Sequence, residues 1–138
     1  MKNIDIIGSV QPQNTKFPDK KSTIVIADDD PAILEAIKLT LELYNFNVET
    51  IGDGVVIPKL VSLQPKLLLL DICMSGADGR EICKMMKTLD ATKDIPVIMI
   101  SASCDLQESL AYSGADDFLE KPFEIHELLS KVNKYLLN

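Results

Sequence analysis

The chain has 138 residues, of which 46% are hydrophobic and 25% charged, and its formal net charge at pH 7 is −7. This length suits a single domain with one core, and the composition is that of an ordinary globular protein. Binding to a nucleic-acid backbone requires basic patches that displace counterions, so the acidic balance argues against direct nucleic-acid binding. No stretch approaches the ~20 apolar residues needed to span a bilayer, and residues 1–10 lack the apolar run of a signal peptide.

The three cysteines, Cys73, Cys83 and Cys104, form no CxxC pair and no zinc-like spacing with the single histidine, His126. Their odd number and the missing secretion signal indicate reduced thiols, so we expect a cytoplasmic protein. We interpret the cysteines as packing residues, with Cys104 the only one expected to be exposed, and His126 as a solvated surface residue.

Residues 1–22 are polar and aperiodic, and we interpret them as an N-terminal tail or linker that precedes a domain at 23–138. Within the domain, short apolar runs alternate with longer segments of helical periodicity. We predict five strands, at 23–27, 47–51, 66–70, 97–100 and 117–119.

Helices are predicted between the strands and after the last one. Asp30 caps the first helix and Pro31 occupies its first position. The second is predicted at 54–63, with Pro58 interrupting its hydrogen bonds. The strict alternation predicts an α/β fold, a doubly wound parallel sheet of five strands with helices on both faces.

Polar residues follow four of the predicted strands, at the edge where ligands bind in such sheets. Carboxylates that converge there would repel one another unless a divalent cation is shared between them, and oxygen ligands favour Mg²⁺. Each feature alone has an ordinary explanation as a turn, a helix cap, a strand end or plain surface. Their joint placement instead predicts a site for a phosphoryl group between a metal and a lysine, formed by Asp28, Asp29, Asp30, Asp71, Ser101 and Lys121.

Six short motifs in one order resemble the receiver domain of two-component response regulators. They are IVIADDD at 24–30, LDICM at 70–74, DG at 78–79, PVIMISA at 96–102, GADDF at 114–118 and KPF at 121–123. The resemblance implies a flavodoxin-like sheet with strand order 2-1-3-4-5. One departure is Ser75, where the family usually has proline.

The resemblance also implies a role for each matching residue. Asp71 is expected to be the phosphoacceptor and Lys121 the phosphate-binding lysine, joined by a cis peptide to Pro122. The expected ligands of Mg²⁺ are Asp71, Asp29 directly, Asp28 partly through water, and the backbone carbonyl of Cys73. Ser101 and Phe118 are the expected switch residues.

These roles imply a signalling switch rather than an enzyme acting on other substrates. Asp71 would accept the phosphoryl group from the phosphohistidine of a sensor histidine kinase or phosphotransfer protein. Cys73 and Ser103 are expected to flank the hydrolytic water, and because neither orients it well, dephosphorylation should be slow. As the chain ends at Asn138 after the last helix, we expect a single-domain regulator that signals through an unknown downstream protein.

The main alternative is a degenerate receiver that acts as a docking module without phosphorylation. A haloacid-dehalogenase-like phosphatase would need an aspartate at position 73, and a flavin carrier would need a hydroxyl- and glycine-rich loop at 28–30. For assembly we expect a monomer or weak dimer, because Asp116, Asp117 and Glu120 have no basic counterpart at 105–113.

Overall fold

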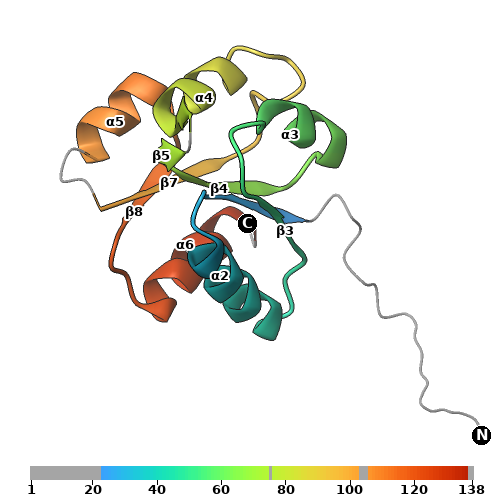
Figure 1. Cartoon of the computed structure of the whole chain (residues 1–138), viewed down its shortest axis with the longest axis vertical. Helices are drawn as coiled ribbons and strands as arrows, with labels where there is room; N and C mark the ends of the chain where they lie inside the picture. The colour runs from blue at the N-terminus through green and yellow to red at the C-terminus, as the bar shows by residue number, and fades with distance from the viewer. Residues whose placement is uncertain (1–22, 75, 103–105, 137–138) are drawn as a thin grey trace, which may run out of the picture.

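The structure is a computed structural model, and it describes residues 23–74, 76–102 and 106–136. Figure 1 shows the arrangement of the elements around a central sheet. In chain order they are β2 (Ile24–Ala27), α2 (Pro31–Leu43), β3 (Val48–Ile51), α3 (Ile57–Leu63), β4 (Leu67–Asp71), β5 (Cys73–Met74), β6 (Ala77–Asp78), α4 (Gly79–Met86), β7 (Val97–Ser101), α5 (Leu106–Ser113), β8 (Asp117–Glu120) and α6 (Ile125–Leu136).

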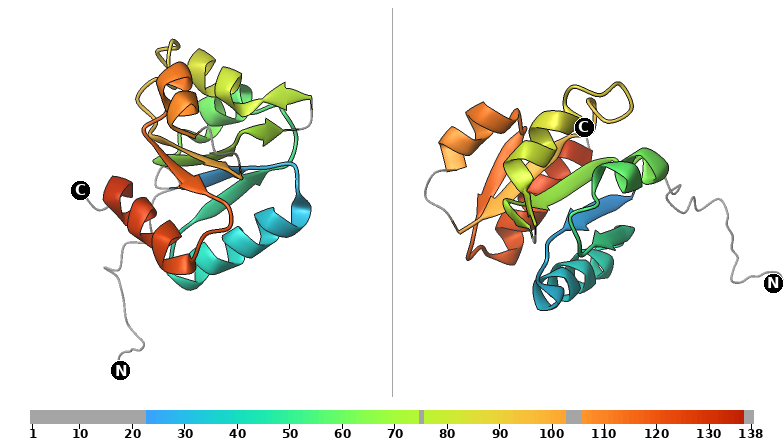
Figure 2. Two further views of the ribbon diagram at one scale, coloured as in Figure 1. Left: turned by 90° about the vertical axis from the view of Figure 1, so that its left-hand side faces the viewer. Right: turned by 45° about the horizontal axis from the view of Figure 1, so that its top comes forward.

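The sheet has five parallel strands in the order β3-β2-β4-β7-β8, which confirms the predicted order 2-1-3-4-5. Helices α2 and α6 cover one face of the sheet, and α3, α4 and α5 cover the other (Figures 1 and 2). The central strand β4 is buried along its whole length, which explains its uninterrupted leucines. Because β2 and β4 are parallel neighbours, their carboxyl ends lie next to each other.

Two hydrophobic layers hold the sheet between the helices. Along β2, Val25 and Ala27 pack into the layer under α3 and α4, while Ile24 and Ile26 pack into the layer under α2 and α6. Because side chains alternate across a strand, each buried strand contributes to both layers. The strand ends are thereby fixed on both sides by packed side chains.

The predicted start of the first helix is confirmed. The carboxylate of Asp30 accepts hydrogen bonds from the backbone N–H groups of Ala32 and Ile33, and Pro31 occupies the first helical position. A side-chain oxygen at this place satisfies N–H groups that have no partner within the helix. The cap also fixes the direction in which the chain leaves the acidic run at the end of β2.

The predicted interruption of the second helix is wrong. Helix α3 begins at Ile57 rather than at residue 54, so Pro58 lies in its first turn. The first N–H groups of a helix have no intrahelical acceptor, and a proline there removes no hydrogen bond. Pro58 therefore suits the start of this helix.

A short antiparallel hairpin, β5–β6, follows β4 and was not predicted. Cys73 pairs with Asp78 and Met74 with Ala77, while Gly76 adopts a positive φ of 72°. Glycine reaches this conformation without the steric cost that a side chain adds. The hairpin lies directly beside the end of β4. Ser75, where the sequence departs from the family pattern, lies outside the described residues.

Nowhere in the described part of the chain is a helix long and apolar enough to cross a membrane.

Candidate functional site

The structure brings the predicted site residues together at the carboxyl edge of the sheet, except that the carboxylate of Asp30 caps α2 and does not join the cluster. Asp28 follows β2, Asp71 is the last residue of β4, Ser101 is the last residue of β7, and Lys121 follows β8. The strands are parallel and in register, so residues far apart in the sequence meet at one edge. Both β4 and β7 extend one residue further than predicted, and Asp71 and Ser101 are those terminal residues.

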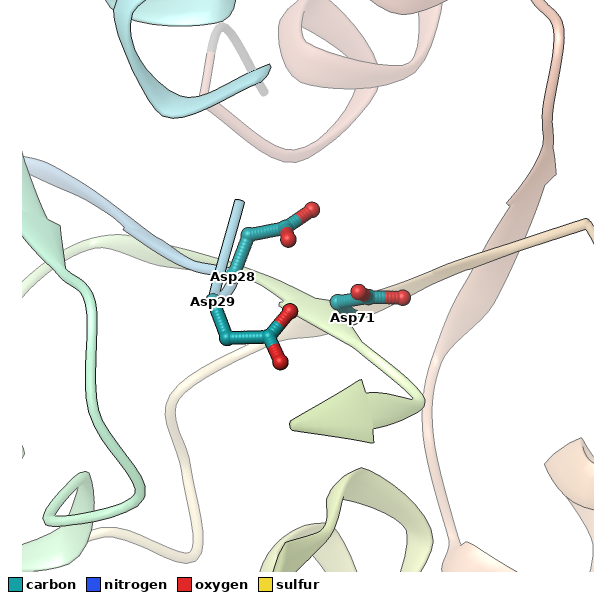
Figure 3. Close-up of side chains that lie close together, drawn as sticks. All are labelled: Asp28, Asp29 and Asp71. Atoms are coloured by element: carbon teal, nitrogen blue, oxygen red, sulfur yellow. The ribbon is translucent and has the colours of Figure 1, made fainter. Parts of the chain in front are cut away.

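Three carboxylates form the centre of this edge. One oxygen each from Asp28, Asp29 and Asp71 lie within 4.8 Å of one another. Figure 3 shows the three side chains converging from the ends of β2 and β4. Asp28 and Asp71 are only 3% and 6% exposed, whereas Asp29 is exposed. The cluster thus combines two buried acids with one that solvent can reach.

Hydrogen-bond donors hold the two buried carboxylates in place. The backbone N–H of Asp30 donates to Oδ1 of Asp28 at 3.0 Å, and that of Cys73 donates to Oδ1 of Asp71 at 3.4 Å. Nζ of Lys121 lies 3.2 Å from Oδ2 of Asp28 and 3.7 Å from Oδ2 of Asp71. One ammonium group therefore lies within ion-pair distance of both buried acids, and the phosphate-binding role of Lys121 stays a prediction.

The electrostatics of the cluster favour a bound cation. Burial and the neighbouring Asp28 raise the pKa of Asp71 to about 6, although Lys121 and the N–H of Cys73 act in the opposite direction. A single lysine is thus too little positive charge for this group of carboxylates. The donor set contains only oxygen atoms and includes an accessible one on Asp29, which fits a hard divalent cation such as Mg²⁺.

The two predicted switch residues lie on neighbouring strands. Ser101 is 4% exposed at the end of β7, and Phe118 is half-buried on β8, where it pairs in register with Met99. The Lys121–Pro122 peptide is cis, as predicted, and the Lys121 ammonium lies beside Asp71. The switch roles of Ser101 and Phe118 stay predictions.

The cysteine assignment needs one correction, because the side chain of Cys73 is exposed while that of Cys83 is buried. Cys73 belongs to the two-residue strand β5 at the rim of the site, where its side chain is exposed while that of the next residue, Met74, is buried. Ser103 and Cys104 lie outside the described residues. His126 is a surface residue as expected, with a 76% exposed side chain beside Glu124.

Gly79 is a site residue whose role the sequence analysis missed. Its N–H donates to the carbonyl of Ile72 at 2.7 Å, so the start of α4 lies against the end of β4. A Cβ at Gly79 would overlap the carbonyl oxygen of Asp71 and lie 2.9 Å from Cα of Ile72. Only glycine permits this approach, and the Asp78-Gly79 motif was the signal for it.

An apolar groove of about 490 Å³ opens beside the cluster, between α2 and α6. Its lining includes Ile33, Ile37, Phe123, Ile125 and Leu128, and it shares Lys121 with the carboxylate cluster. None of the three clustered aspartates lines it. The carboxylate cluster therefore belongs to the strand ends and not to the groove.

Comparisons with known proteins agree with this geometry. The sequence model of the response regulator receiver domain matches residues 24–133. The DNA-binding dual master transcriptional regulator RpaA of Synechocystis sp. is 39% identical over an alignment of 116 residues, which covers 82% of this chain and 48% of the relative. The chain spans about half the length of the curated relatives it matches.

Solved structures give the same result for the fold. A response regulator receiver domain protein from Methanospirillum hungatei has a TM-score of 0.75 at 29% identity, with 83% of this chain and 93% of that chain covered. The receiver domain of a sensor histidine kinase from Pseudomonas aeruginosa, solved with a magnesium ion in its active-site cleft, has a TM-score of 0.77 at 21% identity, with 85% and 98% covered. With the family match over residues 24–133 and the matching sheet order, the chain belongs to the response regulator receiver domain family.

Proposed function

We propose that this chain is a phosphorylatable switch in which Asp71 accepts a phosphoryl group from the phosphohistidine of a sensor histidine kinase or a phosphotransfer protein. The observation that carries the proposal is the position of Asp71 between two further carboxylates and the ammonium of Lys121. A docking module that is never phosphorylated has no need for this grouping of buried charges, whose assembly costs free energy.

The reaction is an in-line displacement at phosphorus. A carboxylate oxygen of Asp71 forms the new O–P bond while the N–P bond to the donor imidazole breaks, and the imidazole leaves with the electron pair. Lys121, 3.7 Å from Oδ2 of Asp71, offsets negative charge on the equatorial phosphoryl oxygens. The N–H of Cys73 orients Asp71 through Oδ1. The chain catalyses no other reaction in this proposal, and its dephosphorylation is slow.

Asp28, Asp29 and Asp71, with the carbonyl of Cys73, are the proposed ligands of Mg²⁺. Both oxygens of Asp28 have donors within hydrogen-bond or ion-pair distance, whereas Asp29 is exposed at the rim. We therefore assign Asp29 as the direct ligand and Asp28 as one acting partly through water. When bound, Mg²⁺ supplies positive charge that stabilises the transferring phosphoryl group.

The signal is a shift between two conformations of the β7 and β8 ends. Ser101, buried at the end of β7, donates its hydroxyl to a phosphoryl oxygen, and Phe118 moves toward the space that Ser101 leaves. The altered surface lies over α5, β8 and α6. The relative RpaA is described as DNA-binding, but this acidic chain is proposed to pass its signal through a protein contact in the cytoplasm.

Acetyl phosphate, a small phosphodonor, tests the proposal without knowledge of the kinase. With Mg²⁺ present, the intact mass of the chain should rise by one phosphoryl group, and EDTA should abolish the gain. Asp71→Asn, which keeps the side-chain size but removes the nucleophile, should show no gain under the same conditions. A parent chain whose mass is unchanged after incubation with acetyl phosphate and Mg²⁺ would favour the docking-module alternative.

A further inference from the structure

The ring of Phe118 has a cationic partner on α6 that the proposed function does not use. Nζ of Lys131 lies 5.6 Å from the centroid of the Phe118 ring. This distance is within the range in which an ammonium group is attracted to the face of an aromatic ring. Phe118 is half-buried on β8, the edge strand of the sheet, where a side chain from α6 can reach it.

Lys131 is held in this position by Asp117, the residue next to Phe118. Its Nζ lies 2.9 Å from Oδ1 of Asp117, and the same oxygen accepts the backbone N–H of Phe118 at 2.8 Å. Oδ2 of Asp117 lies 3.2 Å from the hydroxyl of Tyr135 and 3.4 Å from Nζ of Lys134. Both carboxylate oxygens of Asp117 are thus held by neighbouring groups, and the ion pair with Asp117 holds the ammonium of Lys131 in place.

The carboxylate of Asp117 stays ionised at neutral pH. Burial raises its pKa, but hydrogen bonds from Lys131, from the N–H of Phe118 and from Lys134 outweigh burial and lower the pKa below its ordinary value. To follow a ring that moved away, Lys131 would have to stretch its ion pair with this charged anchor. The anchor therefore favours the contact in the ring position that the structure shows.

From this geometry we propose that Lys131 is a positioning residue that holds the Phe118 ring at the edge of β8 and thereby opposes the switch. The inference rests on the proposed function, since it concerns the ring movement that phosphorylation of Asp71 drives. A contact favoured in the unphosphorylated position lowers the affinity for a phosphoryl group by linkage. Lys131 then sets how much phosphorylation is needed to reach the active conformation.

Beryllofluoride, which mimics a phosphoryl group on a carboxylate, gives an equilibrium readout of this opposition. The experiment titrates beryllium into the full chain at fixed excess fluoride and saturating Mg²⁺, and follows amide shifts by NMR. The test variant is Lys131→Met, which keeps an unbranched side chain and removes the charge. Lys134→Met is the matched control, because Lys134 also pairs with Asp117 but lies over the ring of Tyr135 rather than that of Phe118.

Lys131→Met should bind beryllofluoride about two- to five-fold more tightly than the parent, the factor expected for one cation–π contact at a partly exposed site. Lys134→Met should bind like the parent. In a Phe118→Leu background the gain from Lys131→Met should vanish, since a double-mutant cycle isolates the pair.

Three results would overturn the inference while leaving the proposed function intact. They are a Lys131→Met affinity equal to that of the parent, an equal gain in Lys134→Met, and a gain that persists in the Phe118→Leu background. A parent chain that binds no beryllofluoride would instead overturn the proposed function, and this inference with it.

Discussion

At the residue scale, the two acids that follow β2 differ in what surrounds them. Asp28 is buried, with the N–H of Asp30 on one oxygen and Lys121 beside the other. Asp29 is exposed, yet one of its oxygens lies within 4.8 Å of those of Asp28 and Asp71. An accessible carboxylate exchanges water for a cation more readily than one already paired with an ammonium group. Asp29 is therefore better placed than Asp28 to bind a cation directly, although the two residues are neighbours in the sequence.

This difference predicts unequal effects on metal affinity. Asp29→Ala should weaken Mg²⁺ binding by about ten-fold or more, the size seen when a direct charged interaction worth ~1.4 kcal/mol is lost. Asp28→Ala should weaken binding less, because the charge of Asp28 is already partly offset by Lys121 and this carboxylate is expected to act partly through water. Calorimetric titration of Mg²⁺ into both variants and the parent provides the comparison. Equal affinities in all three proteins would place the metal elsewhere.

Asp71 itself is predicted to destabilise the metal-free protein at neutral pH. Its pKa is raised to about 6 in the folded state, above the ~3.9 of an unfolded chain. The folded protein therefore binds more protons between these values, and its stability falls as the pH rises through that window. Above pH 6 the whole cost is present, and below pH 4 it is absent.

Replacing Asp71 by Asn should remove this cost. In EDTA at pH 7, Asp71→Asn should be more stable than the parent by roughly 1–3 kcal/mol, a span set by the pKa shift. The two proteins should converge near pH 4, where Asp71 is protonated, and Mg²⁺ should stabilise the parent more than the variant. Urea unfolding at both pH values measures the difference, and a variant less stable than the parent at pH 7 would refute the electrostatic account.

At the scale of elements, the site depends on how closely α4 approaches the end of β4. Gly79 opens α4 and its N–H donates to the carbonyl of Ile72. A side chain there would collide with the backbone of Asp71 and Ile72, and backbone atoms within a buried strand cannot move aside cheaply. The position of Asp71 is therefore coupled to the packing of this helix.

Gly79→Ala should cost about 1–3 kcal/mol of unfolding free energy, the usual cost of overpacking, and should slow phosphorylation by acetyl phosphate. Gly52→Ala is the matched control, since a Cβ there would meet Cδ1 of Leu34 at an ordinary 3.6 Å. Urea unfolding and the rate of mass gain report the two effects. The proposed coupling fails if both alanine variants behave alike in both measurements.

The sequence predicted the elements and the gathering of the site better than it predicted local packing. Strand order came with the family resemblance, and the charged residues at the strand ends were visible because long apolar runs precede them. The hairpin was missed because a two-residue strand has no measurable alternation. Gly79 belongs to a recognisable motif, but glycine is required there by a close contact with Asp71 and Ile72, which no local sequence pattern contains. The predicted interruption at Pro58 is wrong because the helix begins three residues later than the sequence pattern indicates, which places Pro58 in its first turn.

At the scale of the whole molecule, Asp116 and Asp117 of the β8 region are already paired within the chain. Asp116 lies 2.9 Å from Nζ of Lys87, and Asp117 pairs with Lys131 and Lys134. Carboxylates engaged in this way would have to exchange partners before they could bind a second copy, and exposed ion pairs contribute only ~0–1 kcal/mol each. The surface over α5, β8 and α6 thus has little electrostatic drive for self-association.

We accordingly expect a monomer before phosphorylation and at most a weak dimer afterwards. Light scattering at micromolar concentration, with and without acetyl phosphate and Mg²⁺, distinguishes the two states. Charge reversal at Lys131 or Lys134 provides a control, because a dimer that used Asp117 would respond to it. A stable dimer in the absence of phosphate would contradict the expectation.

The central claim, that Asp71 is the residue that carries the phosphoryl group, can be tested at the level of the single residue. Borohydride reduces an aspartyl phosphate to homoserine, so the modified position survives proteolysis and can be sequenced by mass spectrometry. After treatment with acetyl phosphate and Mg²⁺, homoserine should be found at position 71 and at none of Asp28, Asp29 or Asp30. Homoserine at one of those three, or at no position in a chain that is otherwise folded and binds Mg²⁺, would contradict the account.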